Sequence, residues 1–139
     1  MELTANALQT VELNQNVQFT DTAVCGSCSI IHRDGSGLVT LRGLTNQCRA
    51  RFKAFFSGNV AIPAGGTVEA ISLALAVNGE AIASTTMIQT PAAVEEFANV
   101  ASAVYIDVPA DCCVTISVRN TSTQAIDMQN ANLIIERIA

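Results

Sequence analysis

Five cysteines are the side chains with the clearest chemical potential in this sequence. They stand as Cys25-Gly-Ser-Cys28, a single Cys48 and the adjacent pair Cys112-Cys113. A Cys-x-x-Cys turn brings two thiolates to the spacing of tetrahedral zinc, and one cysteine of the adjacent pair together with Cys48 or His32 could complete such a site. A strong zinc signature needs a second Cys-x-x-Cys or a His-x3-His, which is missing here. Cys25, Cys28 and Cys48 are therefore the zinc candidates, and we expect neither a bound metal nor another cofactor.

A redox role is the second chemistry that Cys-x-x-Cys suggests. A thioredoxin-like centre places this motif at the start of a helix that follows a strand, where the helix dipole favours the thiolate. Here the motif precedes a strand and a hairpin. The N-terminus, Met1 to Thr4, has no basic leader and no apolar segment, so we expect no signal peptide. Together with the odd number of cysteines, this favours reduced thiols buried as small hydrophobic groups, with Cys112 or Cys113 in the core.

Catalytic groups are sparse. His32 is the one histidine, and no nucleophile motif or second base accompanies it, so we expect a turn-proximal histidine at the surface or in an interface. Glu95 and Glu96 are adjacent carboxylates that suit solvated charge better than a glycosidase pair. The glycines at 35–37 and 65–66 lack the lysine and hydroxyl residue of a phosphate loop. The sequence therefore predicts that the protein is not an enzyme.

The elements that position these residues are strands. Apolar residues recur at every second position, and Asn-Gly or Asp-Gly turns separate the runs. Thr90 and Pro91 favour at most one short helical turn near 91–97. We expect an all-β fold, a jelly-roll β-sandwich of about nine or ten antiparallel strands. The expected strands are about 7–13, 16–20, 28–33, 38–43, 48–58, 67–77, 80–88, 99–108, 112–119 and 126–137.

Length and composition limit the number of domains and the kind of surface that the chain can have. The chain has 139 residues, 50% of them hydrophobic but only 14% charged and 4% aromatic. This length suits one jelly-roll domain over 1–139, with 1–16 as an extended N-terminal arm or an edge strand. Charged residues usually make up about 25% of a soluble domain, so part of this surface is expected to be covered by another subunit. No apolar run is long enough to cross a membrane.

The uncharged surfaces lie on particular strands. In the strand 67–77, one face carries Ile71, Leu73 and Leu75, whereas the other carries the small residues Ala70, Ser72, Ala74 and Ala76. The run from Leu133 to Ile138 is rich in aliphatic residues, with four among its six positions. We expect a neighbouring subunit to cover both.

Charge is uneven along the chain. The net charge of −5 argues against a nucleic-acid partner. Five basic residues lie between 33 and 53, whereas 54–118 holds none and has six acidic residues. These two sets pair either between subunits or between neighbouring strands of one chain. Within 49–56, Arg49, Arg51 and Lys53 share one strand face and Phe52 and Phe56 share the other, which predicts an amphipathic strand.

The order of strands and turns resembles a known family. The segments that carry the likeness are the hairpin 30–43, the run 51–63 with Gly58-Asn-Val-Ala-Ile-Pro63, the Asn78-Gly79 turn, 108–120 and the closing strand 130–137. They resemble the small jelly-roll trimer domains, similar to tumour-necrosis-factor and complement globular heads, of tailed-phage and prophage structural proteins and of spore-surface glycoproteins. The resemblance implies a homotrimer around a threefold axis. The interface candidates are Ala70, Ser72, Ala74, Ala76, Tyr105, Leu133 and Ile135, although this chain has fewer aromatic residues than the family packs around its axis.

The function that the resemblance implies is that of a non-enzymatic virion structural protein. As a homotrimer it would decorate a capsid or form part of a head fibre, and it would be assembled in the host cytoplasm and contact capsid or other virion proteins. The alternative is a carbohydrate- or receptor-binding head of a phage fibre or bacterial surface protein, which would bind a host surface glycan with the loops 34–37, 78–80 and 120–125. A cupin-like enzyme is disfavoured because one histidine cannot supply its metal ligands.

Overall fold

The computed structural model describes all 139 residues as twelve strands and one short 3-10 turn. Their bounds are β1 Glu2–Ala5, β2 Gln9–Val11, β3 Asp21–Val24, β4 Ile30–His32, β5 Val39–Arg42, β6 Arg49–Ala61, β7 Ile71–Val77, β8 Glu80–Ala81, η1 Ala83–Thr85, β9 Met87–Gln89, β10 Ala98–Pro109, β11 Cys113–Asn120 and β12 Ile126–Arg137. All strand pairs are antiparallel. No helix has the length and apolar character needed to cross a membrane.

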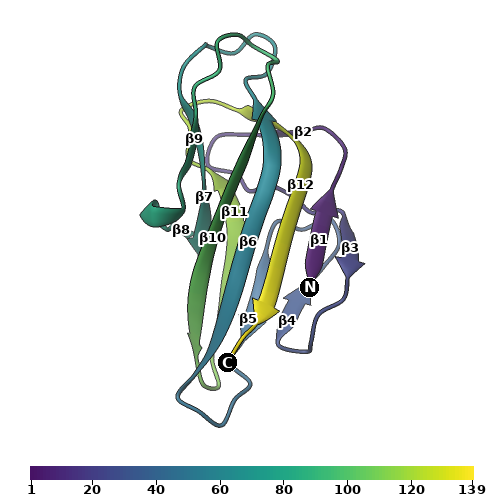
Figure 1. Ribbon diagram of the computed structural model, residues 1–139, viewed down its shortest axis with the longest axis vertical. Coiled ribbons are helices and arrows are strands. Elements are labelled where there is room, and N and C mark those ends of the chain that lie inside the picture. Colours follow the sequence, from purple (N-terminus) through teal and green to yellow (C-terminus); the bar gives the residue numbers. More distant parts are fainter.

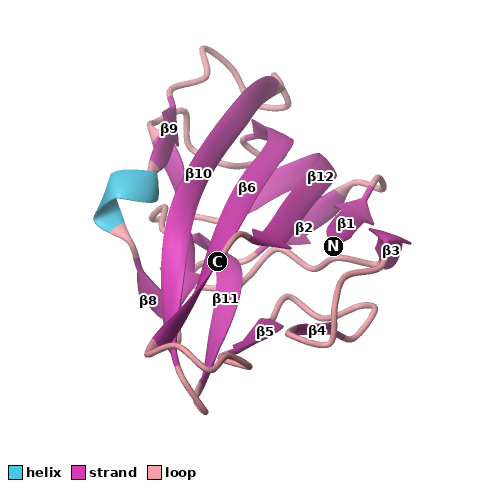
Figure 2. Ribbon diagram, turned by 60° about the horizontal axis from the view of Figure 1, so that its bottom comes forward, coloured by secondary structure: helices cyan, strands magenta, loops and turns pink.

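The strands form two sheets that pack face to face. The first sheet has the order β10-β6-β12-β1-β3, with β2 also pairing to β12, and the second has the order β4-β5-β11-β7-β8, with β9 pairing to β7. Figure 1 shows the long strands β10, β6 and β12 of the first sheet in front of β11, β7 and β5 of the second. Figure 2 shows the same two layers from below, with the helical turn η1 at one side of the sandwich. The predicted all-β sandwich is confirmed.

The core lies between the sheets and consists of a single cluster of 28 buried residues. Alternation along β6 turns Phe52 and Phe56 inward, both fully buried, while Arg51 and Lys53 stay partly exposed on the outer face. The ring of Phe56 meets that of Phe19 edge to face, with centroids 6.3 Å apart, a geometry that aromatic pairs prefer. The predicted amphipathic strand is thus confirmed.

Two turns follow the predicted chemistry. Asn78 and Gly79 have φ values of 52° and 83° between β7 and β8, which is the backbone of a tight Asn-Gly hairpin turn. Residues 34–37 connect the paired strands β4 and β5.

Two expectations about the elements were wrong. The helical turn lies at Ala83–Thr85, not near 91–97. Residues 91–97 form bends and a turn, and Glu95 takes a left-handed φ of 59° while its N–H donates to the carbonyl of Ile62. The expected strand 16–20 is reduced to one bridge, between Asn16 and Arg119. The N-terminal residues 2–5 form β1, which lies between β12 and β3.

Candidate self-association surface

The cysteines do not form a metal site. All five are free and exposed, and nowhere in the chain do three or more histidine, cysteine or acidic side chains gather as a metal site. The zinc candidates Cys25, Cys28 and Cys48 are therefore corrected to separate surface thiols. The expectation that Cys112 or Cys113 is in the core was also wrong, because both lie beside the turn from β10 to β11, outside the sandwich.

His32 has a structural place. Its side chain has no exposed surface, which corrects the expected surface position. Nε2 lies 3.0 Å from the carbonyl oxygen of Ser36 and donates to it in the matching tautomer. Nδ1 has no hydrogen-bond partner and lies 3.7 Å from a carboxylate oxygen of Asp34. The imidazole thus stabilises the β4–β5 turn through its hydrogen bond to Ser36. No cysteine or hydroxyl nucleophile is hydrogen-bonded to the imidazole.

Four of the seven predicted interface residues belong to the interior of the subunit. Ala74, Ala76, Leu133 and Ile135 are each 0% exposed in the isolated chain. Leu133 and Ile135 point into the core, because β12 alternates with Ile134 outward. These four side chains cannot contact a neighbouring subunit, and the prediction is corrected.

The two alanines lie on the outer face of the second sheet, but the chain itself covers them. Arg119 stands opposite Ala74 in the register of β11 and β7, and its Nη1 donates to the carbonyl of Gly79 at 2.8 Å. The arginine side chain therefore runs along β7 past Ala76. Ser72 is half-buried and its hydroxyl is bonded to that of Thr121, and Ala70 is exposed.

Tyr105 is the largest interface candidate that lies on the surface. It is 65% exposed on the outer face of β10, an edge strand of the first sheet. Phe55 stands opposite Ala103 on one side and Ile134 on the other. Both Ile134 and Val24 stand opposite Glu2. We call Tyr105, Ala103, Phe55, Ile134 and Val24 the apolar row. These residues cross the outer face of the first sheet from edge to edge, and Glu2 of β1 stands between Ile134 and Val24.

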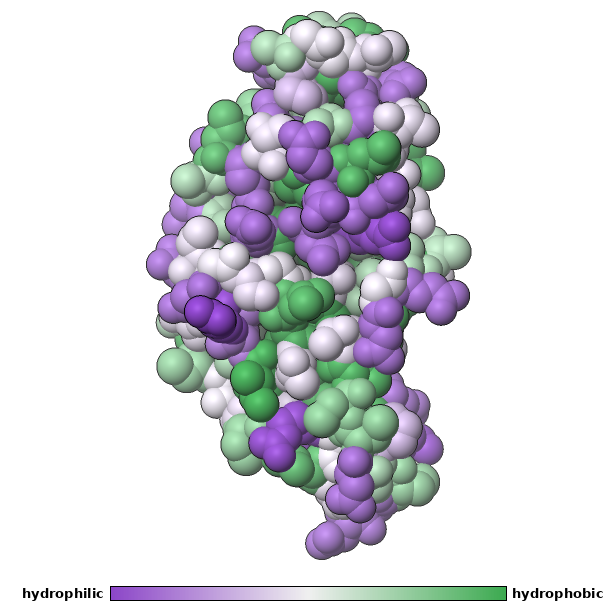
Figure 3. Space-filling model, turned by 180° about the vertical axis from the view of Figure 1, so that it is seen from behind, coloured by the Kyte–Doolittle hydropathy of each residue, from purple (hydrophilic) through white to green (hydrophobic).

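The apolar row is exposed but ordered. Phe55 and Ile134 are each 39% exposed and Val24 is 55% exposed. Tyr105 is two residues from Ala103 on the same strand face, which makes it a diagonal neighbour of Phe55 across the pair β10–β6. Other exposed large hydrophobic side chains, such as Leu8, Val68 and Ile88, are on loops or short edge strands. Figure 3 shows the opposite side of the molecule, where hydrophobic patches alternate with many hydrophilic side chains.

Charged groups border the row. Asp107 accepts two hydrogen bonds from the Arg51 guanidinium, at 2.8 and 3.1 Å, and lies 3.3 Å from Arg49. The hydrogen bonds from Arg51 hold the pKa of the Asp107 carboxyl below its ordinary value, and they raise the pKa of Arg51. These basic and acidic residues thus pair between neighbouring strands of one chain, and the two guanidinium groups with one carboxylate keep a net positive charge. Lys53 and Glu136 stand opposite each other in the register of β6 and β12.

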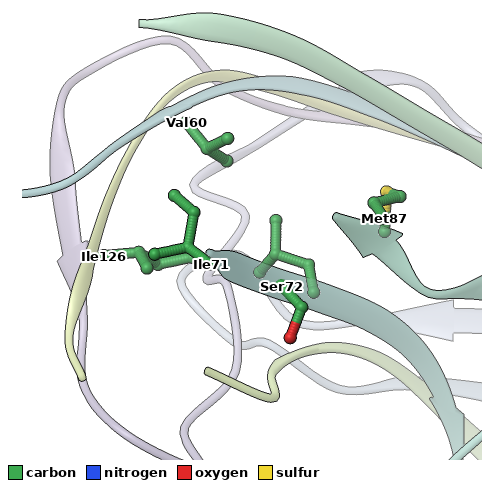
Figure 4. Close-up of a pocket in the computed structure, with 6 residues that line it drawn as sticks. Val60, Ile71, Ser72, Met87 and Ile126 are labelled. Atoms are coloured by element: carbon green, nitrogen blue, oxygen red, sulfur yellow. The ribbon is translucent and has the colours of Figure 1, made fainter. Parts of the chain in front are cut away.

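Recesses large enough for a small ligand are shallow. A gap between the sheets has no room for a water molecule, and it is lined by Val60, Ile71, Ser72, Leu73, Met87 and Ile126 (Figure 4). A groove of about 260 Å³ on the outer face of the first sheet is lined by Met1, Glu2, Val24, Ile134, Ile135 and Glu136. This groove is one end of the apolar row, so the row has a protruding aromatic end and a hollow end.

The three loops named for ligand binding do not converge. The side chain of Asn78 accepts a hydrogen bond from the Thr115 N–H, whereas the loop 120–125 follows the far end of β11. Five strand residues separate these points, which is roughly 17 Å. One small ligand therefore cannot contact both loops.

Comparisons with known proteins identify the fold. No protein-family model and no curated protein matches the chain. The solved structure of the globular domain of zebrafish complement 1qA protein superposes with a TM-score of 0.57 at 10% identity, over 96% of this chain and 93% of that one. The C-terminal domain of EclA, a sugar-binding protein, gives a TM-score of 0.43 at 16% identity over 95% of this chain and 80% of that one. An isomalto-dextranase of Arthrobacter globiformis T6 complexed with panose gives 0.33 at 10% identity, over 91% of this chain and 23% of that one.

The last two TM-scores are too low to establish a shared fold. The first superposition spans nearly the whole of both chains. This chain therefore has the two-sheet antiparallel jelly roll of the complement C1q and tumour-necrosis-factor globular domains.

Proposed function

We propose that this chain is a non-enzymatic structural domain that assembles as a homotrimer and serves as a virion component, a capsid decoration or part of a head fibre. The observation that carries the proposal is the apolar row on the outer face of the first sheet. Contiguous exposed apolar side chains on a soluble domain mark a surface that another molecule covers. Domains with this fold typically form trimers, which supports a second and third copy of this chain as the partners.

The two ends of the row are complementary in shape. The β10 end presents the protruding Tyr105 together with Phe55, whereas the β12 and β3 end presents the groove beside Val24 and Ile134. When unlike patches of identical subunits meet, the contact is heterologous, and it closes into a ring if the rotation allows. Tyr105 of one subunit would enter the groove of the next, and three such contacts would complete the trimer.

Charges of both signs lie side by side on this face of one chain. Lys53 stands opposite Tyr105 in β10 and opposite Glu136 in β12, and opposite charges at such cross-strand positions attract each other. The preference for the unlike pairing therefore rests on shape.

The surface area is sufficient for such an assembly. An obligate interface buries about 2,000 Å² or more over both partners, so a subunit with two interfaces would lose about 2,000 Å² of its own surface. That is a substantial part of the 6801 Å² that the isolated chain exposes. A loss of this size is consistent with a chain in which only 14% of the residues are charged.

The virion role rests on the resemblance of strand order and turns to phage structural proteins. In that role, a trimer presents three copies of each weak contact to its target, and avidity replaces a deep binding site. The shallow recesses of this surface suit such a mechanism. Assembly would take place in the host cytoplasm.

The test combines light scattering with particle binding. The wild-type chain is expected to have the mass of three subunits, and Phe55→Glu is expected to have the mass of one while keeping its strand signal in circular dichroism. The matched control Leu38→Glu changes a 47% exposed side chain outside the apolar row and is expected to remain trimeric. A monomeric wild type contradicts the trimer.

A second experiment separates the virion role from the receptor-binding one. Genes for portal, capsid and tail proteins beside the gene of this chain, and co-sedimentation of the trimer with the corresponding particles, are expected. Binding to a glycan array without particle binding would instead assign a carbohydrate-binding head.

A further inference from the structure

All five cysteines lie at one end of the sandwich. They belong to the segment 25–28 between β3 and β4, to the loop 43–48 between β5 and β6, and to the turn 110–113 between β10 and β11. Figure 1 shows these three connections, with the C-terminus, at the lower end of the molecule. The opposite end has no cysteine.

Backbone hydrogen bonds join the three connections to one another. The Ala110 N–H donates to the carbonyl of Cys48 at 3.1 Å, and the Gly43 N–H donates to the carbonyl of Cys112 at 2.8 Å. The Arg42 N–H donates to the carbonyl of Ser29 at 2.7 Å. The five thiols are therefore held on one continuous, ordered surface.

Exposure of every cysteine is unusual, because free cysteine is among the residues most often buried. None of the five is paired within the chain, and no metal cluster accounts for them. Packing within the subunit thus does not explain why these thiols are at the surface. Disulfide bonds to another chain would explain it.

The thiols fall into two groups according to the edge strand of the first sheet that each segment lies beside. The groups approach each other where Cys113 stands opposite Arg42, whose N–H bonds to Ser29 beside Cys28. Cys25 and Cys28 follow β3, one edge strand of the first sheet. Cys48 immediately precedes β6, and Cys112 and Cys113 follow β10, the other edge strand. In the proposed ring, the β10 side of each subunit meets the β3 side of the next. The same contact places the second thiol group of one subunit beside the first group of its neighbour.

We propose that disulfide bonds between these two groups lock the trimer covalently. Each bond would join Cys25 or Cys28 of one subunit to Cys48, Cys112 or Cys113 of the next. The inference rests on the proposed homotrimer and adds to it a site of covalent modification. A closed set of three such bonds would make the trimer resistant to dilution and to detergent.

The oxidant is a small-molecule disulfide such as oxidised glutathione. A protein thiolate attacks one sulfur of this disulfide, forms a mixed disulfide and releases one small thiolate. The thiolate of the neighbouring subunit then attacks the protein sulfur of the mixed disulfide and releases the second small thiolate. Two protein thiols lose two protons and two electrons, and one small disulfide is reduced to two thiols.

The surroundings of Cys48 suit this reagent. Cys48 shares an open recess with Arg49 and Arg51. Oxidised glutathione is an anion, so the guanidinium groups favour its approach. The bonds would form once the protein leaves a reducing compartment, since disulfides persist at virion and cell surfaces but not in the cytosol.

The experiment uses two full-length variants of different mass. One is Cys25→Ser/Cys28→Ser, and the other is Cys48→Ser/Cys112→Ser/Cys113→Ser with an N-terminal affinity tag. Each variant alone and the two variants co-expressed are oxidised with oxidised glutathione, alkylated and run on a non-reducing denaturing gel. Light scattering before oxidation gives the mass of each sample.

Oxidised wild type is expected to run as a covalent trimer, and each variant alone as a monomer. The co-expressed variants are expected to give a covalent dimer that contains one chain of each kind. Two results would overturn the proposed disulfide bonds but not the homotrimer. In both, the samples have the mass of three subunits before oxidation; afterwards either no bonds form between chains, or bonds form between chains of the same variant. Samples with the mass of one subunit would overturn both.

Discussion

Replacing Tyr105 by alanine removes the largest exposed side chain of the apolar row. Tyr105 is 65% exposed in the isolated subunit. An aromatic side chain buries roughly 200 Å², so a neighbouring subunit would cover about 130 Å² of this residue. At about 25 cal/mol per Å², that burial contributes about 3 kcal/mol to each subunit contact, or roughly a hundredfold in its equilibrium constant. A trimer has three such contacts, and Tyr105→Ala weakens all of them.

The assay is the dissociation of the trimer on dilution, followed by light scattering or sedimentation. The midpoint for Tyr105→Ala is expected at a much higher protein concentration than that of the wild type, with little change in the unfolding of the subunit, because the side chain points away from the core. Ile88→Ala is the matched control, since Ile88 is 66% exposed on β9, outside the row. Equal dissociation of Tyr105→Ala and wild type, or equal weakening by Ile88→Ala, would refute the assignment of this surface.

Three further predictions concern the stability of the subunit. Asn120→Ala is expected to lower the free energy of unfolding by about 3 kcal/mol in urea titration. The fully buried amide donates to three backbone carbonyls, and these would lose their partner. An unchanged urea midpoint would show that water replaces the amide as their donor. Gly43→Ala is expected to lower the melting temperature, because a Cβ there would collide with the carbonyl oxygen of Pro109; a wild-type melting temperature would mean that the loop shifts freely. Asp107→Asn is expected to lower the urea midpoint slightly at neutral pH but not near about pH 2. The hydrogen bonds from Arg51 hold the pKa of this carboxyl below 3.8 in the folded state, so its stabilisation is present above the unfolded-state pKa and is lost as the pH falls through the folded-state pKa; a difference that persists in acid would contradict this cause.

Strand alternation in the sequence was enough to predict the sandwich and much of its core. In β6 the inward positions are apolar and the outward positions from Arg49 to Lys53 are basic, so the inward residues Phe52 and Phe56 were predicted correctly. The Asn78-Gly79 turn followed from the preference of these residues for positive φ. Strand alternation and turn preferences gave correct predictions here because the tertiary structure requires the same backbone and the same buried face as these local preferences do.

The interface residues on β12 show where such rules fail. The run Leu133-Ile134-Ile135 is aliphatic throughout, and only the flanking Asn132 and Glu136, each two positions from Ile134, mark its outer face. A bulge between Gln129 and Asn132, with Asn130 at a φ of 56°, breaks the alternation before this run begins. A shift of one residue reverses the face of every side chain that follows. Ile134, not its two neighbours, therefore faces outward.

The remaining differences come from contacts that are distant in sequence. The small face of β7 is covered by Arg119, a residue more than 40 positions away. The segment 91–97 has the start signals of a helix, but the Glu95 N–H is bonded to Ile62. The positions of the five cysteines at one end of the sandwich depend on which loops meet there, and their spacing in the sequence carries no such information. Only the assembled fold brings the thiols, and likewise the apolar row, together.

Sedimentation equilibrium of the wild-type chain at low micromolar concentration tests the central claim most directly. The subunit mass is 14.5 kDa. A single species with three times this mass is expected, in reducing as well as oxidising buffer, because the apolar row holds the subunits together before any disulfide forms. A single species with the mass of one subunit would contradict the claim.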